Sequence, residues 1–329
     1  MKNAIVMAAG KGTRMHSDVP KVLHEVCGVP MVELIVNELK RAGAERIVTI
    51  TGFGHEKVER VLEGQCEFAL QEPQLGTGHA VMQARALEGE TGVTVVVNGD
   101  APCVRAETYQ SLFEACSNAD MVIFAVRMDP SVAYGRIIRS ADGTVDRIVE
   151  FKDANEQERA VTEMNAGMYA FRNEALFEGL KELTNNNAQH EYYITDLVEI
   201  FRRKGLTVRA LISEDPAELQ GVNDSVELAA ANRTMYDRIR RKWMKNGTSM
   251  TDPDTVYIGP YAEIGRDVVI EPGVQISGHT VIGDRVRIKA HSVLEDCTVK
   301  NGAVVEHAVL KGITIEENEE IPPFTYRKS

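Results

Sequence analysis

The C-terminal part of the chain carries a six-residue repeat that few folds can accommodate. From residue 258 to 294, seven aliphatic residues are spaced six apart without a slip, and the residues four positions after them are small or β-branched. This spacing predicts a parallel β-helix, in which each coil stacks its aliphatic side chains on the next and buries them. The seven are Ile258, Ile264, Ile270, Ile276, Ile282, Ile288 and Leu294.

The segments on either side of the repeat set the predicted domain boundaries. Beyond Leu294 the phase loosens, and we interpret residues 316–323, which end in Pro322-Pro323, as a terminator and polar tail. Before the repeat, residues 225–245 show a helical pattern with the single tryptophan, Trp243, on the apolar face. We therefore divide the chain into a domain at 1–224, a connecting helix and linker at 225–250, and a short β-helix with its tail at 251–329.

Charge and cysteine content exclude several classes of protein. The 329 residues include 37 Lys+Arg and 49 Asp+Glu, for a net charge of −12. This charge disfavours a nucleic acid or an anionic membrane as a partner. The five cysteines show no CxxC pair, which is typical of reduced thiols, and no apolar run approaches the ~20 residues of a membrane span. We expect a cytoplasmic protein that acts on small molecules.

The first 225 residues alternate short apolar runs with helical patterns, which predicts an α/β fold with a mostly parallel sheet and helices on both faces. A helix is expected over residues 31–42, ending at Gly43. The expected strands are 4–7, 46–50, 93–97 and 121–126, with further strands near 167–171 and 207–211.

A glycine-rich turn follows the first predicted strand, over Ala8-Ala9-Gly10-Lys11-Gly12-Thr13-Arg14-Met15. It lacks the third glycine of a dinucleotide fingerprint and the Gly-Lys-Ser/Thr of a P-loop. Small residues in such a turn let backbone N–H groups approach phosphate oxygens, and Arg14 and Lys21 supply positive charge. The alternative is a tight turn without a ligand, and the two cations favour the phosphate interpretation.

Two further segments carry polar residues suited to a nucleotide site. The strand at 93–97 leads into Asn98-Gly99-Asp100, which places a carboxylate outside the carboxyl end of a sheet strand, where ligands of α/β folds bind. An aspartate there is a natural ligand for Mg²⁺, although it could instead cap the helix that begins near Arg105. The glycine-rich segment 71–80 is suited to hydrogen-bonding a base edge.

These motifs together resemble the sugar nucleotidyltransferases, in order and over nearly the whole chain. The resemblance is strongest to the bacterial bifunctional enzymes that join N-acetylglucosamine-1-phosphate uridyltransferase to glucosamine-1-phosphate acetyltransferase. It implies a Rossmann-like mixed-sheet domain followed by a left-handed β-helix. The segments that carry it are Gly10 to Met15, Pro20-Lys21, Gln74 to Gly78, Gly99-Asp100, Tyr134-Gly135-Arg136 and Leu183 to Asp196.

The resemblance also implies a role for individual residues in a Mg²⁺-dependent reaction between UTP and N-acetylglucosamine 1-phosphate. Arg14 would face the β and γ phosphates and Lys21 the reacting phosphates, while Asp100 and Asn223 would hold Mg²⁺. Ala8, Ala9, Gly10 and Gly12 would border the nucleotide. Gln71, Gln74, Gly76 and Thr77 would read uracil, and Gly135, Glu150, Asn165 and Thr195 would hold the sugar.

Two departures from the family qualify this interpretation. The family usually carries tyrosine where this chain has Asn98, which affects the expected nucleotide preference. The acetyl-transfer site of the bifunctional enzymes lies in coils beyond the position of Ser329, so we expect no acetyl transfer and a β-helix that assembles three subunits. The alternatives are another sugar 1-phosphate or dTTP as substrate, a hexapeptide-repeat acyltransferase, and an inactive assembly protein.

Overall fold

The computed structural model describes residues 1–329, which form two compact units. Unit 1 contains Met1–His24 and Pro30–Glu227, and unit 2 contains Glu25–Val29 and Leu228–Ser329. None of the helices has the length and apolar character that a bilayer crossing requires. The division into 1–224, 225–250 and 251–329 remains a proposal.

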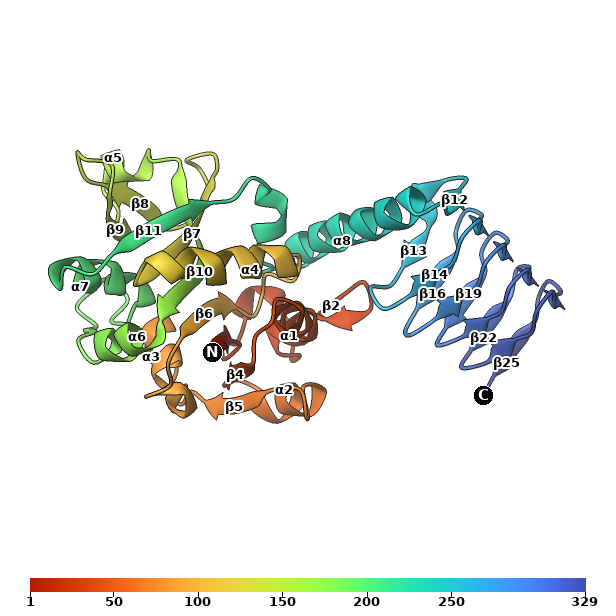
Figure 1. The fold of residues 1–329 in the computed structure, drawn as a ribbon, viewed down its shortest axis with the longest axis horizontal. Helices are drawn as coiled ribbons and strands as arrows, with labels where there is room; N and C mark the ends of the chain where they lie inside the picture. Colours follow the sequence, from red (N-terminus) through yellow and green to blue (C-terminus); the bar gives the residue numbers. More distant parts are fainter. The chain divides into compact units, whose positions relative to one another are not determined.

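Unit 1 is built around a nine-stranded mixed sheet (Figure 1). The main path runs β11-β7-β10-β6-β1-β4-β5, and the hairpin of β8 and β9 pairs with β10 through β8. All neighbours on the main path are parallel except that β10 is antiparallel to both β6 and β7. The strands are β1 (Lys2–Met7), β4 (Arg46–Thr51), β5 (Glu67–Leu70), β6 (Val93–Asn98), β7 (Met121–Arg127), β8 (Arg136–Arg139), β9 (Val145–Val149), β10 (Glu163–Arg172) and β11 (Val208–Ile212).

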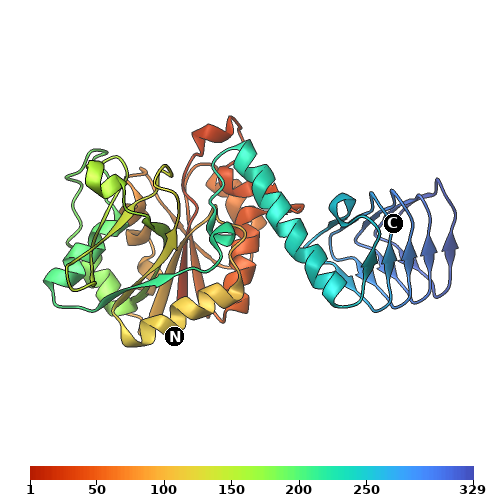
Figure 2. The ribbon, with the colours of Figure 1, turned by 90° about the horizontal axis from the view of Figure 1, so that it is seen from above.

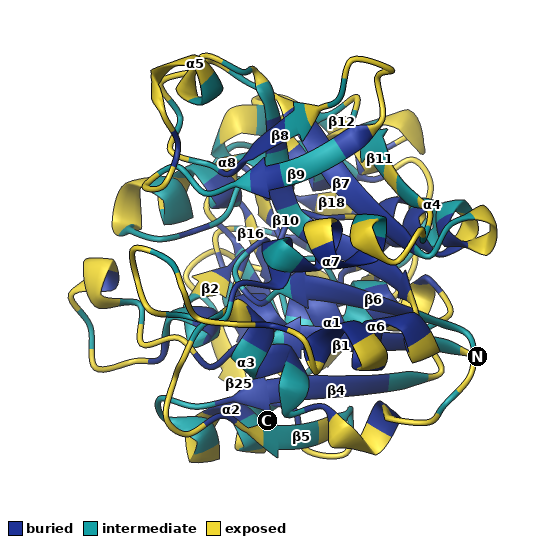
Figure 3. Ribbon diagram, turned by 90° about the vertical axis from the view of Figure 1, so that its left-hand side faces the viewer, coloured by how far each residue is buried: buried dark blue, intermediate teal, exposed yellow.

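Helices cover both faces of this sheet (Figure 2). One face packs against α1 (Met31–Arg41), α2 (His55–Val61) and α4 (Ala106–Ala115). The other packs against α3 (Thr77–Met82), α6 (Asn173–Leu180) and α7 (Leu197–Arg203). Burial of the sheet between two layers of helices explains its apolar strands, which are drawn in dark blue in Figure 3.

The predicted α/β fold is confirmed, including the strands expected from apolar runs and the helix that ends before Gly43. Gly43 has a φ of 89°, a conformation that favours glycine and ends the helix. The sequence pattern did not reveal the direction of β10 or the β8–β9 hairpin. Residues 136–139 and 145–149 lack a clear apolar alternation, because charged residues interrupt it.

Parallel strands place the first site residues at one edge of the sheet. Met7, at the end of β1, is in register with Asn98, at the end of β6. The Gly99 N–H then donates a hydrogen bond of 2.9 Å to the Met7 carbonyl. The turn after β1 and the turn after β6 therefore start side by side, at the edge where α/β proteins bind ligands.

The predicted β-helix is confirmed in unit 2. Short strands form three parallel sheets of five, five and four strands, and all seven aliphatic residues of the repeat are buried. The strands are β12 (Ser249–Met250), β13 (Tyr257–Ile258), β14 (Glu263–Ile264), β15 (Val269–Ile270), β16 (Gln275–Ser277), β17 (Val281–Ile282), β18 (Arg287–Ile288), β19 (Val293–Glu295), β20 (Thr298–Val299), β21 (Val304–Val305), β22 (Val309–Lys311), β23 (Thr314–Ile315), β24 (Glu320–Ile321) and β25 (Tyr326–Lys328).

The predicted terminator and polar tail are wrong. Strands β23, β24 and β25 extend all three sheets through this region. The repeat loses its six-residue phase because the coils shorten: paired strand residues are 18 apart at Tyr257–Gln275, 17 apart at Val281–Thr298 and 16 apart at Val293–Val309. The aliphatic interior continues through the shorter coils.

The helix α8 (Ser225–Lys245) has the predicted bounds and buries Met235, Ile239 and Trp243. Within unit 2 it packs against a hairpin of β2 (Glu25–Val26) and β3 (Val29–Pro30). The Cys27 N–H donates a hydrogen bond of 2.8 Å to Asn232 Oδ1. An early segment of the chain therefore belongs to the C-terminal unit, an arrangement that the order of residues along the chain does not suggest.

Candidate active site

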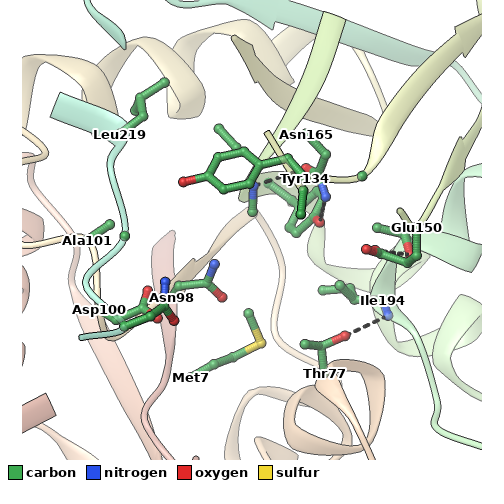
Figure 4. Close-up of a pocket in the computed structure, with 18 residues that line it drawn as sticks. Met7, Thr77, Asn98, Asp100, Ala101, Tyr134, Glu150, Asn165, Ile194 and Leu219 are labelled. Carbon is green, nitrogen blue, oxygen red and sulfur yellow. Dashed lines mark hydrogen bonds between the residues drawn. The ribbon is translucent and has the colours of Figure 1, made fainter. Parts of the chain in front are cut away.

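Two cavities in unit 1 meet at the ends of β1 and β6 and share a wall formed by Met7, Thr77, Asn98 and Asp100. We call them the Gln71 cavity, of about 300 Å³, and the Glu150 cavity, of about 250 Å³. Figure 4 shows the Glu150 cavity, with Asp100 and Glu150 on opposite sides of it. Two ligands could thus lie next to each other with Asp100 between them.

Most of the sequence-predicted site residues line one of these cavities. Ala8, Ala9, Gly10, Lys21, Gln71, Gln74, Gly76 and Thr77 line the Gln71 cavity. Gly135, Glu150, Asn165, Thr195 and Asn223 line the Glu150 cavity. Asp100 lines both, as does Thr77. The fold therefore brings residues from distant parts of the sequence into two groups. Most residues expected at the nucleotide line the Gln71 cavity, and those expected at the sugar line the Glu150 cavity.

Arg14 and Gly12 line neither cavity. Arg14 is exposed in a short 3₁₀ turn, Thr13–Met15, and its contact with phosphates stays a prediction. Gly12 instead supports Lys21: it has a φ of 65°, and a Cβ added there would lie 2.5 Å from the Lys21 Cβ. A larger residue at position 12 would therefore push the Lys21 side chain from its place.

Three polar side chains converge where the cavities meet. The Lys21 ammonium forms an ion pair with the Asp100 carboxylate and donates a hydrogen bond of 3.1 Å to Asn223 Oδ1. The side chains of Lys21 and Asp100 retain only 14% and 19% of their exposure. Their attraction is therefore less screened by water than that of a surface pair.

The backbone around Asn223 is tied to the end of β6 and to α8. The Val222 N–H donates a hydrogen bond of 2.8 Å to the Asp100 carbonyl. The Asn223 N–H donates a hydrogen bond of 2.7 Å to Glu227 Oε2, on the first turn of α8. These contacts hold the Asn223 amide beside Asp100, although the two residues are more than a hundred positions apart.

This cluster fits a divalent cation that shares its coordination with substrate. Asp100 and Asn223 present oxygen atoms to one positive group, the Lys21 ammonium. No group of three or more His, Cys, Asp or Glu residues is arranged to hold a metal ion. A site with two protein oxygens suits Mg²⁺, which keeps several waters and binds phosphate oxygens.

The wall of the Gln71 cavity is held by side-chain contacts to the backbone. Gln74 Nε2 donates a hydrogen bond of 2.9 Å to the Ala9 carbonyl, which joins this loop to the glycine-rich turn. Thr77 Oγ1 accepts a hydrogen bond of 3.1 Å from the Ile194 N–H. Gln71 is 4% exposed and donates to the Gly76 carbonyl at 2.9 Å.

The Glu150 cavity carries a carboxylate and a carboxamide in a partly buried wall. Thr195 Oγ1 donates a hydrogen bond of 3.2 Å to Glu150 Oε1. The Asn165 N–H donates a hydrogen bond of 2.9 Å to the Gly135 carbonyl, and its Nδ2 donates one of 2.6 Å to the Tyr169 hydroxyl. Burial raises the pKa of Glu150, and the Thr195 hydrogen bond opposes that rise.

Asp196, at the start of α7, has a strongly perturbed carboxyl group. Burial, with the negative charges of Glu199, Glu150 and Asp153, raises its pKa from 3.8 to about 6. The folded protein therefore binds this proton more tightly than the unfolded chain does. The resulting stability is present below about pH 4 and is lost as the pH rises through about 6.

We expect Asp196→Asn to raise the free energy of unfolding at pH 7.5 and to leave it unchanged near pH 4. The variant removes a charge that is unfavourable only when ionised, and a gain of about 1–2 kcal/mol is expected once partial exposure is allowed for. Urea unfolding at the two pH values measures it. Glu199→Gln, at an exposed neighbour, serves as the control with a smaller effect. An equal change at both pH values would contradict the prediction.

Sequence reasoning missed how several other residues shape the cavities. Tyr134 and Gly221 line the Glu150 cavity together, which brings the loop before Gly135 next to the Asn223 segment. Arg136 is fully buried and donates to the Tyr134 and Pro130 carbonyls. The motif Tyr134-Gly135-Arg136 indicated this loop but not the role of Arg136, whose charged side chain is buried against the backbone of the same loop.

Asn98 is the residue that departs from the family pattern, and it lines both cavities. Its amide lies over Gly167, where β10 bulges and an added Cβ would be 2.3 Å from Asn98 Nδ2. Gly167 has a φ of 73°. A glycine at this bulge therefore makes room for the Asn98 side chain at the junction of the cavities.

Comparison with known proteins agrees with this geometry. Residues 4–193 match the MobA-like NTP transferase domain, and residues 253–321 match the GMPPB C-terminal domain. The chain is 47% identical over 327 residues to the bifunctional protein GlmU of Geobacillus thermodenitrificans, covering 98% of this chain and 71% of that protein. The chain belongs to the GlmU family. The family that the motifs indicated is thereby confirmed.

Other members of the GlmU family show the same relationship. The GlmU proteins of Geobacillus sp. strain WCH70 and of Limosilactobacillus reuteri are each 46% identical over 326 residues, covering 98% of this chain and 71% of the relative. With its NTP transferase domain, the chain is a nucleotidyltransferase enzyme of the GlmU type. Such enzymes act on small-molecule substrates and use a divalent metal ion.

Proposed function

We propose that this enzyme transfers a uridylyl group from UTP to N-acetyl-α-D-glucosamine 1-phosphate, giving UDP-N-acetylglucosamine and pyrophosphate. The Gln71 cavity would hold UTP and the Glu150 cavity the sugar phosphate. One observation carries the proposal: Lys21 lines the first cavity and Asn223 the second, and at the shared wall the Lys21 ammonium contacts both Asp100 and Asn223. This arrangement suits a reaction between phosphates of two adjacent ligands.

The reaction requires positioning and charge neutralisation rather than proton transfer. A phosphate oxygen of the sugar phosphate attacks the α-phosphorus of UTP, a new P–O bond forms, and the bond to the departing pyrophosphate breaks. The attacking oxygen is already ionised near neutral pH, so no general base is required. No histidine lines either cavity, in agreement with this. Lys21 would offset the charge that builds on the reacting phosphates.

Asp100 and Asn223 would hold Mg²⁺ on the phosphate side of the shared wall. When bound, the ion would reduce the repulsion between the two anionic reactants and stabilise negative charge. Asp100 and Asn223 are themselves held by the end of β6 and by Glu227, so their oxygen atoms need little rearrangement.

Pyrophosphate release tests this assignment. The purified protein would be incubated with Mg²⁺, a panel of sugar 1-phosphates, and each of UTP, dTTP, ATP and GTP in turn. We expect the highest kcat/KM for pyrophosphate release with the pair UTP and N-acetylglucosamine 1-phosphate, and little release with the other pairs. A clear preference for another nucleotide or sugar would replace the proposed substrates with those, and no release with any pair would contradict the proposal.

We expect the preference for the N-acetylated sugar to depend on Asn165. Its carboxamide and the Glu150 carboxylate can hydrogen-bond sugar hydroxyls and the acetamido group, and a partner left unpaired costs about 1–3 kcal/mol. Wild-type kcat/KM should favour N-acetylglucosamine 1-phosphate over glucosamine 1-phosphate and glucose 1-phosphate by about 10–100-fold. Asn165→Ala should remove most of this preference.

The matched control is Asn118→Ala, which removes an exposed carboxamide away from both cavities. It should keep the wild-type preference. Equal kcat/KM for all three sugars in the wild type would contradict the role of the Glu150 cavity. A preference unchanged by Asn165→Ala would show that another residue selects the sugar.

Three further expectations stand beside the reaction. Unit 2 would assemble three copies of the chain, because the flat faces of hexapeptide coils commonly pack about a threefold axis. The protein would act in the cytoplasm. The expected lack of acetyl transfer also stays a prediction, for which release of free CoA from acetyl-CoA and glucosamine 1-phosphate is the measurement.

A further inference from the structure

The Gln71 carboxamide is held in one orientation by its partners. Its Nε2 lies 2.9 Å from the Gly76 carbonyl, which can only accept a hydrogen bond. The atom at that position must therefore be the nitrogen, and the oxygen lies on the other side of the amide. No protein donor contacts Gln71 Oε1, and Gln71 lines the cavity. The side chain thus offers an acceptor to a ligand.

His79 is the second partner of the same nitrogen. Its Nδ1 lies 3.2 Å from Gln71 Nε2, on helix α3. Because the Gln71 nitrogen is a donor, Nδ1 must accept, which requires that it carry no proton. The second amide hydrogen of Gln71 is thereby used, and the carboxamide cannot turn over without losing both hydrogen bonds.

The surroundings of the His79 ring oppose its protonated form. The Nε2 of Gln83 donates 2.9 Å to the His79 carbonyl and lies 3.2 Å from His79 Nε2. With Nδ1 accepting from Gln71, the neutral ring carries its proton on Nε2, where Gln83 is only a neighbour because its amide donates to the His79 carbonyl. An imidazolium would add an N–H at Nδ1, directed at the N–H₂ group of Gln71. The third neighbour is the Tyr192 ring, 6.3 Å away between centroids, and none of the three is charged at neutral pH. Burial lowers the pKa of His79.

We propose that His79 is a positioning residue for base recognition: its neutral ring holds Gln71 with Oε1 toward the base, so the site selects a base that presents an N–H donor there. This inference rests on the proposed function. Uracil offers the imide N3–H, whereas cytosine has an unprotonated nitrogen at the same position. If His79 becomes protonated or is removed, the carboxamide is free to turn and discrimination between the two bases falls.

The test compares kcat/KM for UTP and CTP between about pH 5.5 and pH 8. The ratio cancels effects of pH on the phosphates and on turnover, because both nucleotides share them. In the wild type we expect the UTP/CTP ratio to fall by about tenfold or more toward low pH, since one misplaced buried hydrogen bond is worth about that factor. A ratio independent of pH would overturn the proposal.

Variants separate positioning from a structural role. His79→Asn keeps an acceptor near the Nδ1 position that cannot be protonated in this range, so the ratio should stay high at every pH. His79→Leu should give a low ratio at every pH. Gln83→Leu removes the other amide beside the ring without touching Gln71, and as the matched control it should keep the high wild-type UTP/CTP ratio at pH 8, where His79 is neutral.

The outcomes also separate this inference from the proposed function. A wild type that prefers a nucleotide other than UTP contradicts the proposed function. A wild type that prefers UTP, together with an unchanged ratio in His79→Leu, contradicts only the role of His79. Should His79→Leu fail to fold, the wild-type pH profile and the flat profile of His79→Asn decide the question.

Discussion

Replacing Asp100 with asparagine is expected to lower kcat/KM by roughly 10²- to 10³-fold, the usual loss when one preorganised electrostatic contact is removed. Asp100 is the only proposed metal ligand that lines both cavities and the only carboxylate that pairs with Lys21. The variant keeps the size of the side chain but removes its charge. Initial rates of pyrophosphate release, measured against Mg²⁺ concentration, should show a lower maximum and a higher half-saturating concentration.

The control for Asp100→Asn is Asp252→Asn, which makes the same chemical change at an exposed position in unit 2. It should keep wild-type activity. Both variants should unfold at the wild-type temperature to within a few degrees, which separates loss of chemistry from loss of fold. Near-normal activity of Asp100→Asn, and of Asn223→Ala beside it, would remove the metal assignment.

Substitution of Lys21 by methionine should reduce kcat by about 10²-fold or more while changing KM for UTP much less. The ammonium matters most as negative charge builds on the reacting phosphates, so its loss falls on the transition state. Methionine preserves the unbranched stem that packs over Gly12. Steady-state kinetics with varied UTP measure the two constants separately.

The same variant has a second expected effect, on metal binding by the free protein. Lys21 occupies the point toward which Asp100 and Asn223 direct their oxygen atoms. Without the ammonium, Mn²⁺ should bind the nucleotide-free variant more tightly than it binds the nucleotide-free wild type, as measured by calorimetry.

For the kinetic prediction, a raised KM for UTP with an unchanged kcat in Lys21→Met would instead make Lys21 a nucleotide-docking residue.

Periodicity and strand ends explain why much of this site could be predicted from the sequence. The apolar run before Asp100 and the apolar run before the glycine-rich turn each indicated a buried strand, and parallel strands bring their ends together. Asn223 needed the family resemblance, because no local pattern marks it. The six-residue spacing of aliphatic side chains identified the coils of the β-helix only where each coil has eighteen residues.

The contacts that no pattern predicted are those between distant segments. Thr77 with Ile194 and Gln74 with Ala9 each join segments that are far apart in the chain. Such pairs leave no spacing in the sequence, since their distance along the chain is set by the topology.

The ion pair at the junction of the cavities also stabilises the protein when no ligand is bound, because it neutralises the partly buried Asp100 carboxylate. A desolvated carboxylate normally needs a partner, and Lys21 provides one from within the chain itself. The resting site is therefore electrically self-contained, and its architecture does not depend on the supply of free cations. The Lys21 ammonium keeps the proposed metal ligands Asp100 and Asn223 in place when no metal is bound. The stability of the fold therefore need not follow the metal concentration on which turnover is expected to depend.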